Sequence, residues 1–342
     1  MAWRAEGLRY KTKTDSRAGI LIDILSRGQN NRGMRRLICA VWASVLLGVF
    51  TIAISPRVCA QQVPAAIASD PAPDKTDPAA VEAFQLPSHG ALLNAIVYIA
   101  AGTGPHPVVV LLHGFPGNEK NLDLAQAIRR DGWDVLYFNY RGSWGSPGDF
   151  SFTHCIEDTE AAIAYLRDAA NAKKLRADPA RIVLIGHSMG GFMANFAGAE
   201  DPSVEAVGMI SAANLGGMDT WPLGSADKPS GATVASVAAA LAKEDMAPLA
   251  GCTPESLARE VIANQASWDS IGFAPKLVSR PVLVVTSDDG LAAPNDAFVA
   301  ALKKAGSAKV TAIHMATDHV YSDHRIALET AVLTWLDSLP RP

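Results

Sequence analysis

The chain has 342 residues, of which 49% are hydrophobic and 19% charged, and its formal net charge is −4 at pH 7. These values suit a globular protein with one large α/β domain and an insertion, or with two small domains. Residues 1–60 hold ten Lys or Arg against three Asp or Glu, so the rest of the chain is acidic. An acidic body argues against nucleic acid as the main partner.

The basic N-terminal region resembles a targeting segment. A Met-Arg-Arg triplet at 34–36 precedes an apolar run over 37–54, and small residues follow at 58–60. This pattern is typical of a secretory signal peptide over 34–60, with 1–33 as an upstream extension, and the long apolar run also allows an uncleaved membrane anchor. We therefore expect a secreted or periplasmic protein, or one anchored to a membrane with its remaining chain outside the cytoplasm.

The region after the targeting segment changes character twice. Residues 61–80 are rich in Ala, Pro and Asp without an apolar period, which predicts a flexible linker. From residue 81 to residue 342, short apolar runs alternate with longer amphipathic segments, after two antiparallel strands over 81–86 and 91–100. This alternation predicts an α/β domain with a mostly parallel sheet and helices on both faces. The further strands are expected at 108–112, 135–138, 182–185, 206–210, 282–285 and 310–315, and the helices at 122–130, 156–166, 192–199 and up to 339.

One interval breaks the alternation. About seventy residues separate the strand ending near Ser211 from the one beginning at Pro281, and they are rich in Ala with Gly and Pro interruptions. Connections in compact domains are usually far shorter. We expect residues 215–278 to form a small helical cap over the carboxyl edge of the sheet, or a peripheral insertion remote from the site.

The sequence Gly-His-Ser-Met-Gly at 186–190 is the strongest chemical signal in the chain. It follows the expected buried strand and precedes an expected helix. A sharp strand-to-helix turn of this kind exposes a serine hydroxyl at the edge of the sheet. The pattern therefore predicts Ser188 as a nucleophile, with the backbone amide of Met189 as one donor to an oxyanion.

A serine nucleophile needs a histidine base, and three histidines lie in the C-terminal part of the chain. His314 is inside the last apolar run and is expected to pack as a strand residue. His319 lies in the loop after that strand and is free to approach Ser188, whereas His324 begins the last helix. We favour His319 as the base and keep His324 as the alternative.

The histidine in turn needs an acid to orient it. Thr-Ser-Asp-Asp-Gly at 286–290 follows the carboxyl end of an expected strand, and a carboxylate there precedes His319 by one helix and one strand. We favour Asp289, which is next to the flexible Gly290, and keep Asp288 as the alternative.

A second oxyanion donor is expected in the loop after the strand 108–112. The sequence there is His-Gly-Phe-Pro-Gly at 113–117. The backbone amide of Phe115 is available as a donor, whereas Pro116 has no amide hydrogen. His113 is expected to have a structural role.

These motifs, in the order Ser188, Asp289 and His319, resemble those of the α/β-hydrolase fold over roughly residues 81–340. The loop Arg-Gly-Ser-Trp-Gly-Ser-Pro-Gly-Asp-Phe at 141–150 resembles that of the dienelactone-hydrolase and prolyl-oligopeptidase-like branches, without the propeller domain of the latter. Trp144 in this loop is a candidate apolar wall of the substrate site.

The resulting hypothesis is a secreted serine hydrolase that cleaves a small-molecule ester and requires no cofactor or metal. The alternatives are a peptidase or aminopeptidase, a thioesterase or an acyltransferase with the same three residues, and, from another class, a non-catalytic binding protein. Cleavage after residue 60 leaves Cys155 and Cys252, which could form a disulfide in an oxidising compartment.

Overall fold

The computed structural model of the protein describes residues 63–217 and 231–340. These residues belong to one unit, Gln62–Pro342. The expected upstream extension over 1–33 and the signal peptide or anchor over 34–60 lie outside the described residues. Within the described ranges, no helix combines the length and the hydropathy needed to cross a membrane.

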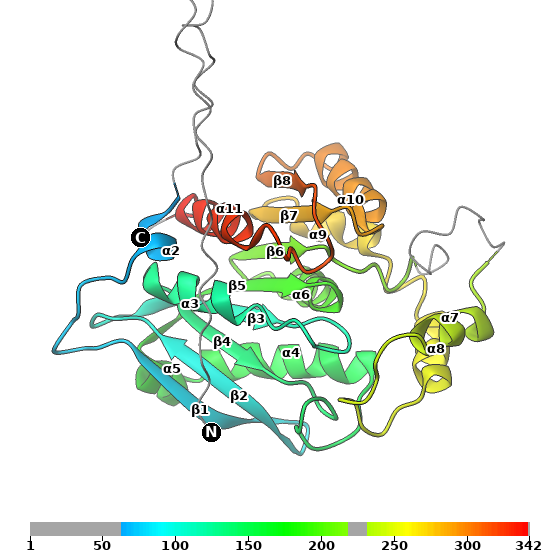
Figure 1. Ribbon diagram of the computed structural model, residues 1–342, viewed down its shortest axis with the longest axis horizontal. Coiled ribbons are helices and arrows are strands. Elements are labelled where there is room, and N and C mark those ends of the chain that lie inside the picture. Colours follow the sequence, from blue (N-terminus) through cyan, green and yellow to red (C-terminus); the bar gives the residue numbers. More distant parts are fainter. Residues whose placement is uncertain (1–62, 218–230, 341–342) are drawn as a thin grey trace, which may run out of the picture. The chain divides into compact units, whose positions relative to one another are not determined.

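An eight-stranded sheet organises the fold, with the strand order β1-β2-β4-β3-β5-β6-β7-β8 (Figure 1). The pairs β1/β2 and β2/β4 are antiparallel, and every later neighbour pair is parallel. The predicted α/β-hydrolase fold with a mostly parallel sheet is therefore confirmed. The strands are β1 (Ala80–Ser88), β2 (Ala91–Ile99), β3 (His106–Leu112), β4 (Asp134–Phe138), β5 (Ala177–His187), β6 (Ala206–Ile210), β7 (Val282–Ser287) and β8 (Val310–Met315).

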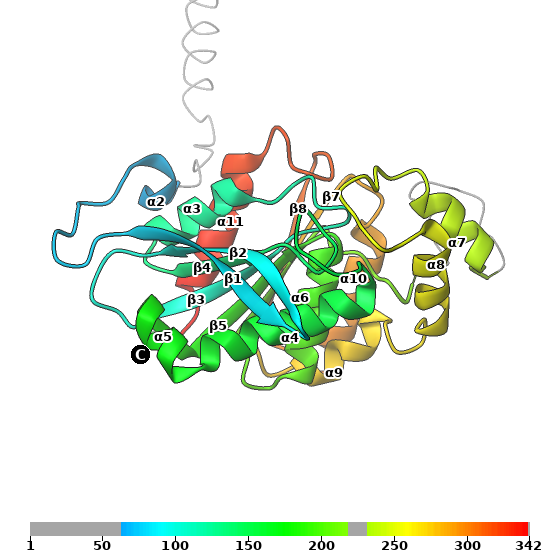
Figure 2. The ribbon, with the colours of Figure 1, turned by 90° about the horizontal axis from the view of Figure 1, so that it is seen from below.

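The sheet is covered on both faces, which explains why its central strands are apolar without alternation. Val108 and Val110 of β3 join one hydrophobic cluster, whereas Val109 and Leu111 join the other. Figures 1 and 2 show the helices on the two sides of the strands. The first cluster includes residues of α4 (Phe152–Arg167), α5 (Ala169–Leu175), α6 (Met189–Glu200), α9 (Ala274–Leu277) and α10 (Ala292–Lys304), and the second includes residues of α2 (Ala65–Ala68), α3 (Leu122–Arg130) and α11 (Arg325–Asp337).

The expected strands and helices are present as strands and helices, and they differ from the expected ranges mainly in where they begin and end. Helix α5 was not expected, and its N-cap Asp168 accepts hydrogen bonds from two backbone amides of the first turn. The segment predicted as a flexible linker includes α2, in which Ala66 is buried and accepts a hydrogen bond from Arg130 through its carbonyl. The flexibility of this segment stays a prediction.

The insertion between β6 and β7 divides into two parts. Helices α7 (Val234–Leu241) and α8 (Pro254–Ala263) pack against each other and stand beside the rest of the fold (Figure 1). The 3-10 helix η2 (Ser270–Phe273) and α9 instead pack against α6 and α10. In the described part of the insertion, the cap is therefore formed by α7, α8 and their connections. It is narrower than the predicted 215–278, of which 218–230 lie outside the described residues.

Candidate active site

Ser188 occupies a sharp turn between the end of β5 and the start of α6. Its φ of 56° and ψ of −121° are sparsely populated for a residue with a side chain. Two hydrogen bonds hold this conformation: the Ser188 amide donates to the Ile210 carbonyl at 2.9 Å, and the Ser188 carbonyl accepts from the Ala213 amide at 2.9 Å. The predicted strand-to-helix turn is thus present, and hydrogen bonds from the neighbouring backbone stabilise its unusual conformation.

Gly186 explains why this turn requires small residues. A Cβ atom added to Gly186 would lie 1.9 Å from the carbonyl oxygen of Gly190, so the strand could not approach the first turn of α6 with any larger residue. The close approach brings the amide of Met189 to the beginning of the helix beside Ser188. The first amides of a helix have no intrahelical acceptor, which leaves this amide available to a ligand.

His319 and Asp289 form a direct pair. The Nδ1 atom of His319, in the loop after β8, is 2.7 Å from Oδ2 of Asp289, in the loop after β7. The Asp289 side chain is only 2% exposed, whereas that of His319 is 35% exposed. An acceptor on Nδ1 keeps the hydrogen on that nitrogen in the neutral ring, so Nε2 is free to accept a proton.

The electrostatics of this pair favour a charged Asp289. Burial raises the pKa of Asp289. Hydrogen bonds from His319, from the Leu291 amide and from Ser211 together lower it by more than burial raises it, so that the pKa is about 2. The two alternatives lie elsewhere: Asp288 is exposed and bonds to His314 at 3.1 Å, and His324 pairs with its neighbour Asp323. The structure thus brings together Ser188, Asp289 and His319, but not Asp288 or His324.

A hydroxyl network that the sequence did not indicate supports the acid. Ser211 Oγ is 3.0 Å from Ser287 Oγ and 2.9 Å from the Tyr321 hydroxyl, and all three residues are buried. Ser211 and Ser287 lie at the carboxyl ends of the neighbouring strands β6 and β7, and Tyr321 is two residues beyond His319. The positions of Ser211 and Ser287 at strand ends were the one available signal, because the carboxyl ends of parallel strands meet at the same edge of the sheet.

The loop at 113–117 runs directly against the serine. A Cβ atom added to Gly114 would lie 2.9 Å from Ser188 Cβ, so only glycine allows this approach. His113 is buried, and its Nδ1 is 2.8 Å from the Gly114 carbonyl oxygen. Burial lowers the pKa of His113 to about 4, which agrees with the expected structural role of a neutral ring.

A cavity of about 100 Å³ joins these elements. Ser188 and His319 line it together with both residues whose amides are candidate oxyanion donors. Its other walls are apolar except for Glu244, which follows α7 in the cap. The lining residues are Phe115, Phe152, Ser188, Met189, Ala213, Leu215, Leu241, Glu244, Leu291 and His319.

The structure corrects the expected role of Trp144, which is not among the described residues that line this cavity. Its indole Nε1 donates to the Pro116 carbonyl at 2.9 Å, and its backbone amide donates to the Pro248 carbonyl at 3.0 Å. The 141–150 loop also exchanges backbone hydrogen bonds with Ala250. Trp144 therefore connects the 113–117 loop to the cap.

The possible disulfide between Cys155 and Cys252 is not formed. Cys155 and Cys252 are free thiols in the described structure. Cys155 is enclosed in the core on α4, whereas Cys252 is half-buried in the segment before α8. A disulfide requires its sulfur atoms to be about 2 Å apart. Burial raises the pKa of both thiols, which disfavours their reactive thiolate forms.

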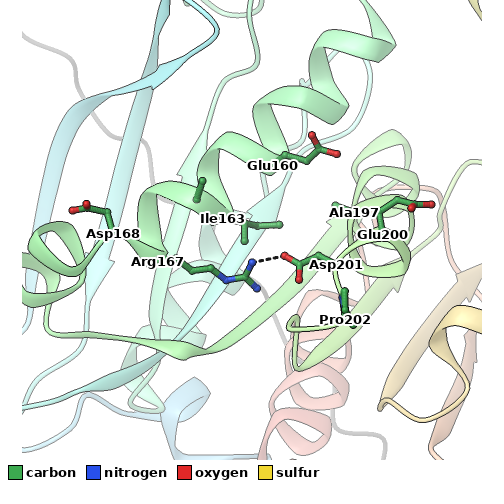
Figure 3. Close-up of a pocket in the computed structure, with 9 residues that line it drawn as sticks. Glu160, Ile163, Arg167, Asp168, Ala197, Glu200, Asp201 and Pro202 are labelled. Carbon is green, nitrogen blue, oxygen red and sulfur yellow. Dashed lines mark hydrogen bonds and ion pairs between the residues drawn. The ribbon is translucent and has the colours of Figure 1, made fainter.

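A larger depression lies away from Ser188, at the other end of the strands, and its lining residues do not form a comparable catalytic arrangement. It measures about 760 Å³ and lies between the C-terminal parts of α4 and α6. Figure 3 shows Arg167 reaching across it to an ion pair with Asp201. The remaining lining residues include no Ser, Cys or His. Among the described residues, no cluster of three or more His, Cys, Asp or Glu is arranged to hold a metal ion.

Comparisons with known proteins agree with the α/β-hydrolase resemblance. Residues 96–251 match the family model described as BD-FAE. An uncharacterized protein of Mycobacterium tuberculosis strain H37Rv is 35% identical over 92 residues, which are 27% of this chain and 31% of that protein. The match thus spans about a third of the length of this curated relative.

Solved structures show the same fold at low sequence identity. The acylaminoacyl peptidase of Pyrococcus horikoshii is 19% identical with a TM-score of 0.57, over 78% of this chain and 43% of that chain. The carboxylesterase EstE1 from a metagenomic library is 21% identical with a TM-score of 0.53, over 78% and 91%. Est1E from Butyrivibrio proteoclasticus, solved with ferulic acid bound, is 19% identical with a TM-score of 0.55, over 75% and 98%.

Proposed function

We propose that this protein, which has the α/β-hydrolase fold, is a serine hydrolase that cleaves carboxylic esters of small molecules. The observation that carries the proposal is the position of His319, which lines one cavity with Ser188 while its Nδ1 atom is 2.7 Å from Asp289. The BD-FAE match and the esterases among the structural neighbours support a hydrolase as the general class.

In the acylation step, His319 Nε2 accepts the hydroxyl proton of Ser188 as Oγ attacks the ester carbonyl carbon. The negative charge that develops on the carbonyl oxygen is stabilised by the amides of Met189 and Phe115. The tetrahedral intermediate then expels the alcohol, which takes the proton from His319. The charged Asp289 stabilises the imidazolium that exists between these two proton transfers.

Deacylation repeats the same geometry with water as the nucleophile. His319 takes a proton from water, which attacks the acyl carbon, and returns it to Ser188 Oγ as the carboxylic acid leaves. The cavity of about 100 Å³ is small compared with ligand pockets of about 300 Å³ or more. We therefore expect a short acyl group, enclosed by apolar side chains, and an alcohol that extends toward solvent.

The test compares Ser188→Ala with Ser203→Ala, which changes the same functional group at an exposed residue on the opposite edge of the sheet. We expect Ser188→Ala to lower kcat for p-nitrophenyl acetate by about 10⁴-fold or more and to abolish labelling by a fluorophosphonate probe. The Ser203→Ala variant should retain both. An active Ser188→Ala protein with a native circular dichroism spectrum would refute the proposal.

A substrate panel separates esters from the other acyl-transfer reactions. Short p-nitrophenyl esters, aminoacyl p-nitroanilides and acyl thioesters share the acyl-enzyme but differ in the leaving group. We expect the esters to give the highest kcat/KM. A higher value for an anilide or thioester would assign peptidase or thioesterase activity, and probe labelling without turnover of any of them would favour transfer to another acceptor.

We also propose that the enzyme acts outside the cytoplasm. The Met-Arg-Arg triplet and the apolar run in residues 34–60 support this location. N-terminal sequencing of protein secreted by a bacterial host should find a chain that begins at Gln61. A full-length chain in the membrane fraction would indicate an anchor instead, and a full-length soluble chain would refute export.

A further inference from the structure

The residue directly before the proposed nucleophile makes an unusual long-range contact. His187 ends β5, and its Nε2 atom is 2.8 Å from the backbone carbonyl oxygen of His319, although 132 positions separate them in the chain. The two imidazole rings also pack together, with their centroids 4.6 Å apart and their planes inclined by 40°. His187 is only 3% exposed, so this contact is made away from solvent.

The contact determines the protonation of the ring. A carbonyl oxygen only accepts hydrogen bonds, so the hydrogen of a neutral His187 must be on Nε2. Its Nδ1 atom is buried and has no hydrogen-bond partner, so a second proton would add a donor that no acceptor satisfies. Burial and the neighbouring His319 lower the pKa of His187 to about 3, which keeps the ring neutral at working pH.

The charges around the ring are consistent with a neutral His187. Burial has the largest effect on the pKa of His187 and lowers it, as do the charges of His319 and Arg325, whereas the hydrogen bond to the His319 carbonyl and the charge of Asp289 act to raise it. During catalysis His319 becomes an imidazolium in the proposed mechanism. A neutral ring packed against it adds no like charge, whereas a protonated His187 would oppose the proton transfer.

The position of the contact suggests its purpose. The side chain of His319 is oriented by Asp289, but this does not determine how far its backbone lies from Ser188. His187 is covalently bonded to Ser188, so one hydrogen bond connects the peptide of the nucleophile to the peptide of the base. Small errors in the placement of reacting groups are costly in rate.

We propose that His187 is a positioning residue. Its Nε2–H hydrogen bond to the His319 carbonyl holds the loop after β8, which carries His319, in place for proton transfer from Ser188. This inference rests on the proposed serine-hydrolase function and adds to it a residue that does not touch the substrate. It predicts an effect on turnover without an effect on substrate binding.

Two variants test the hydrogen bond. In His187→Gln the side-chain amide can still donate to the carbonyl, whereas His187→Leu has a similar volume and no donor. We expect kcat for p-nitrophenyl acetate to fall about tenfold in His187→Leu and by less than about threefold in His187→Gln, with KM nearly unchanged in both. Wild-type kcat in His187→Leu, or equal losses in the two variants, would overturn the proposal.

A measurement on the unaltered protein covers the case in which the variants do not fold. Nitrogen-15 NMR of histidine-labelled protein reports which ring nitrogen carries the hydrogen. We expect His187 to be protonated on Nε2 and to remain neutral between pH 8 and pH 5. A hydrogen on Nδ1 would exclude the proposed donor. If wild-type protein neither cleaves esters nor reacts with the fluorophosphonate probe, the proposed function fails; if it is active and His187→Leu matches it, only the role of His187 fails.

Discussion

Replacement of Asp289 by asparagine is the sharpest test of the proposed charge arrangement. Asn has nearly the same shape as Asp but no negative charge, and its amide can donate a hydrogen bond to Nδ1 of His319. That donation would place the hydrogen of the neutral ring on Nε2, where the ring could no longer accept the proton of Ser188. The variant thus removes the stabilising charge and also favours the wrong tautomer.

The magnitude follows from the environment of the carboxylate. Burial raises the pKa of Asp289, yet the hydrogen bonds led by that of His319 bring it from 3.8 to about 2. This lowering corresponds to about 2.4 kcal/mol in favour of the charged form, or a factor of about 60. Because the change of tautomer adds to the electrostatic loss, we expect kcat to fall by about 10² to 10⁴.

The adjacent residue provides a matched control. Asp288→Asn makes the same chemical change in the same loop, but the Asp288 side chain is 64% exposed and bonds to His314 instead of His319. Hydrolysis of p-nitrophenyl acetate is measured for both variants, with thermal denaturation as the check on folding. A folded Asp289→Asn protein within threefold of wild-type kcat, or an equal loss in Asp288→Asn, would refute the assignment of the acid.

Two further predictions concern acid stability and specificity. Burial, with a contribution from His319, lowers the pKa of His187 to about 3, and burial lowers that of His113 to about 4. Below about pH 6.5 both rings therefore take up a proton when the protein unfolds but not in the folded state, and the free energy of unfolding should fall by about 2 kcal/mol per histidine between pH 6.5 and pH 4.5. Urea denaturation at pH 7 and pH 4.5 should show a smaller fall in His187→Gln; equal falls would contradict the reasoning. Glu244 is the one acidic residue among the described residues that line the cavity, so Glu244→Gln should reduce the preference for a cationic over a neutral isosteric ester by about threefold. Glu255→Gln, an exposed change on α8 of the cap, should leave that ratio unchanged, and an unaltered ratio in Glu244→Gln would exclude Glu244 from substrate selection.

Local patterns in the sequence were sufficient for the architecture and for the candidate nucleophile. The alternation of short apolar runs with amphipathic segments predicts a parallel sheet because each strand buries both of its faces. The glycines around Ser188 predict a tight turn because backbone atoms approach within distances that a Cβ atom would occupy. Each strand and the turn at Ser188 are thus determined by residues that are close together in the chain.

The tertiary structure decided what depends on contacts between distant segments. The sequence favours Asp289 and leaves Asp288 open as the acid, whereas in the structure only Asp289 is enclosed at the sheet edge within reach of His319. The side chain of Trp144 was a candidate wall of the substrate site, but it donates a hydrogen bond to the Pro116 carbonyl. Cys155 and Cys252 could have paired, but both are free thiols in the described structure. The contact between His187 and the His319 carbonyl joins residues that no local pattern connects, because a hydrogen bond depends on position in space and not on distance along the chain.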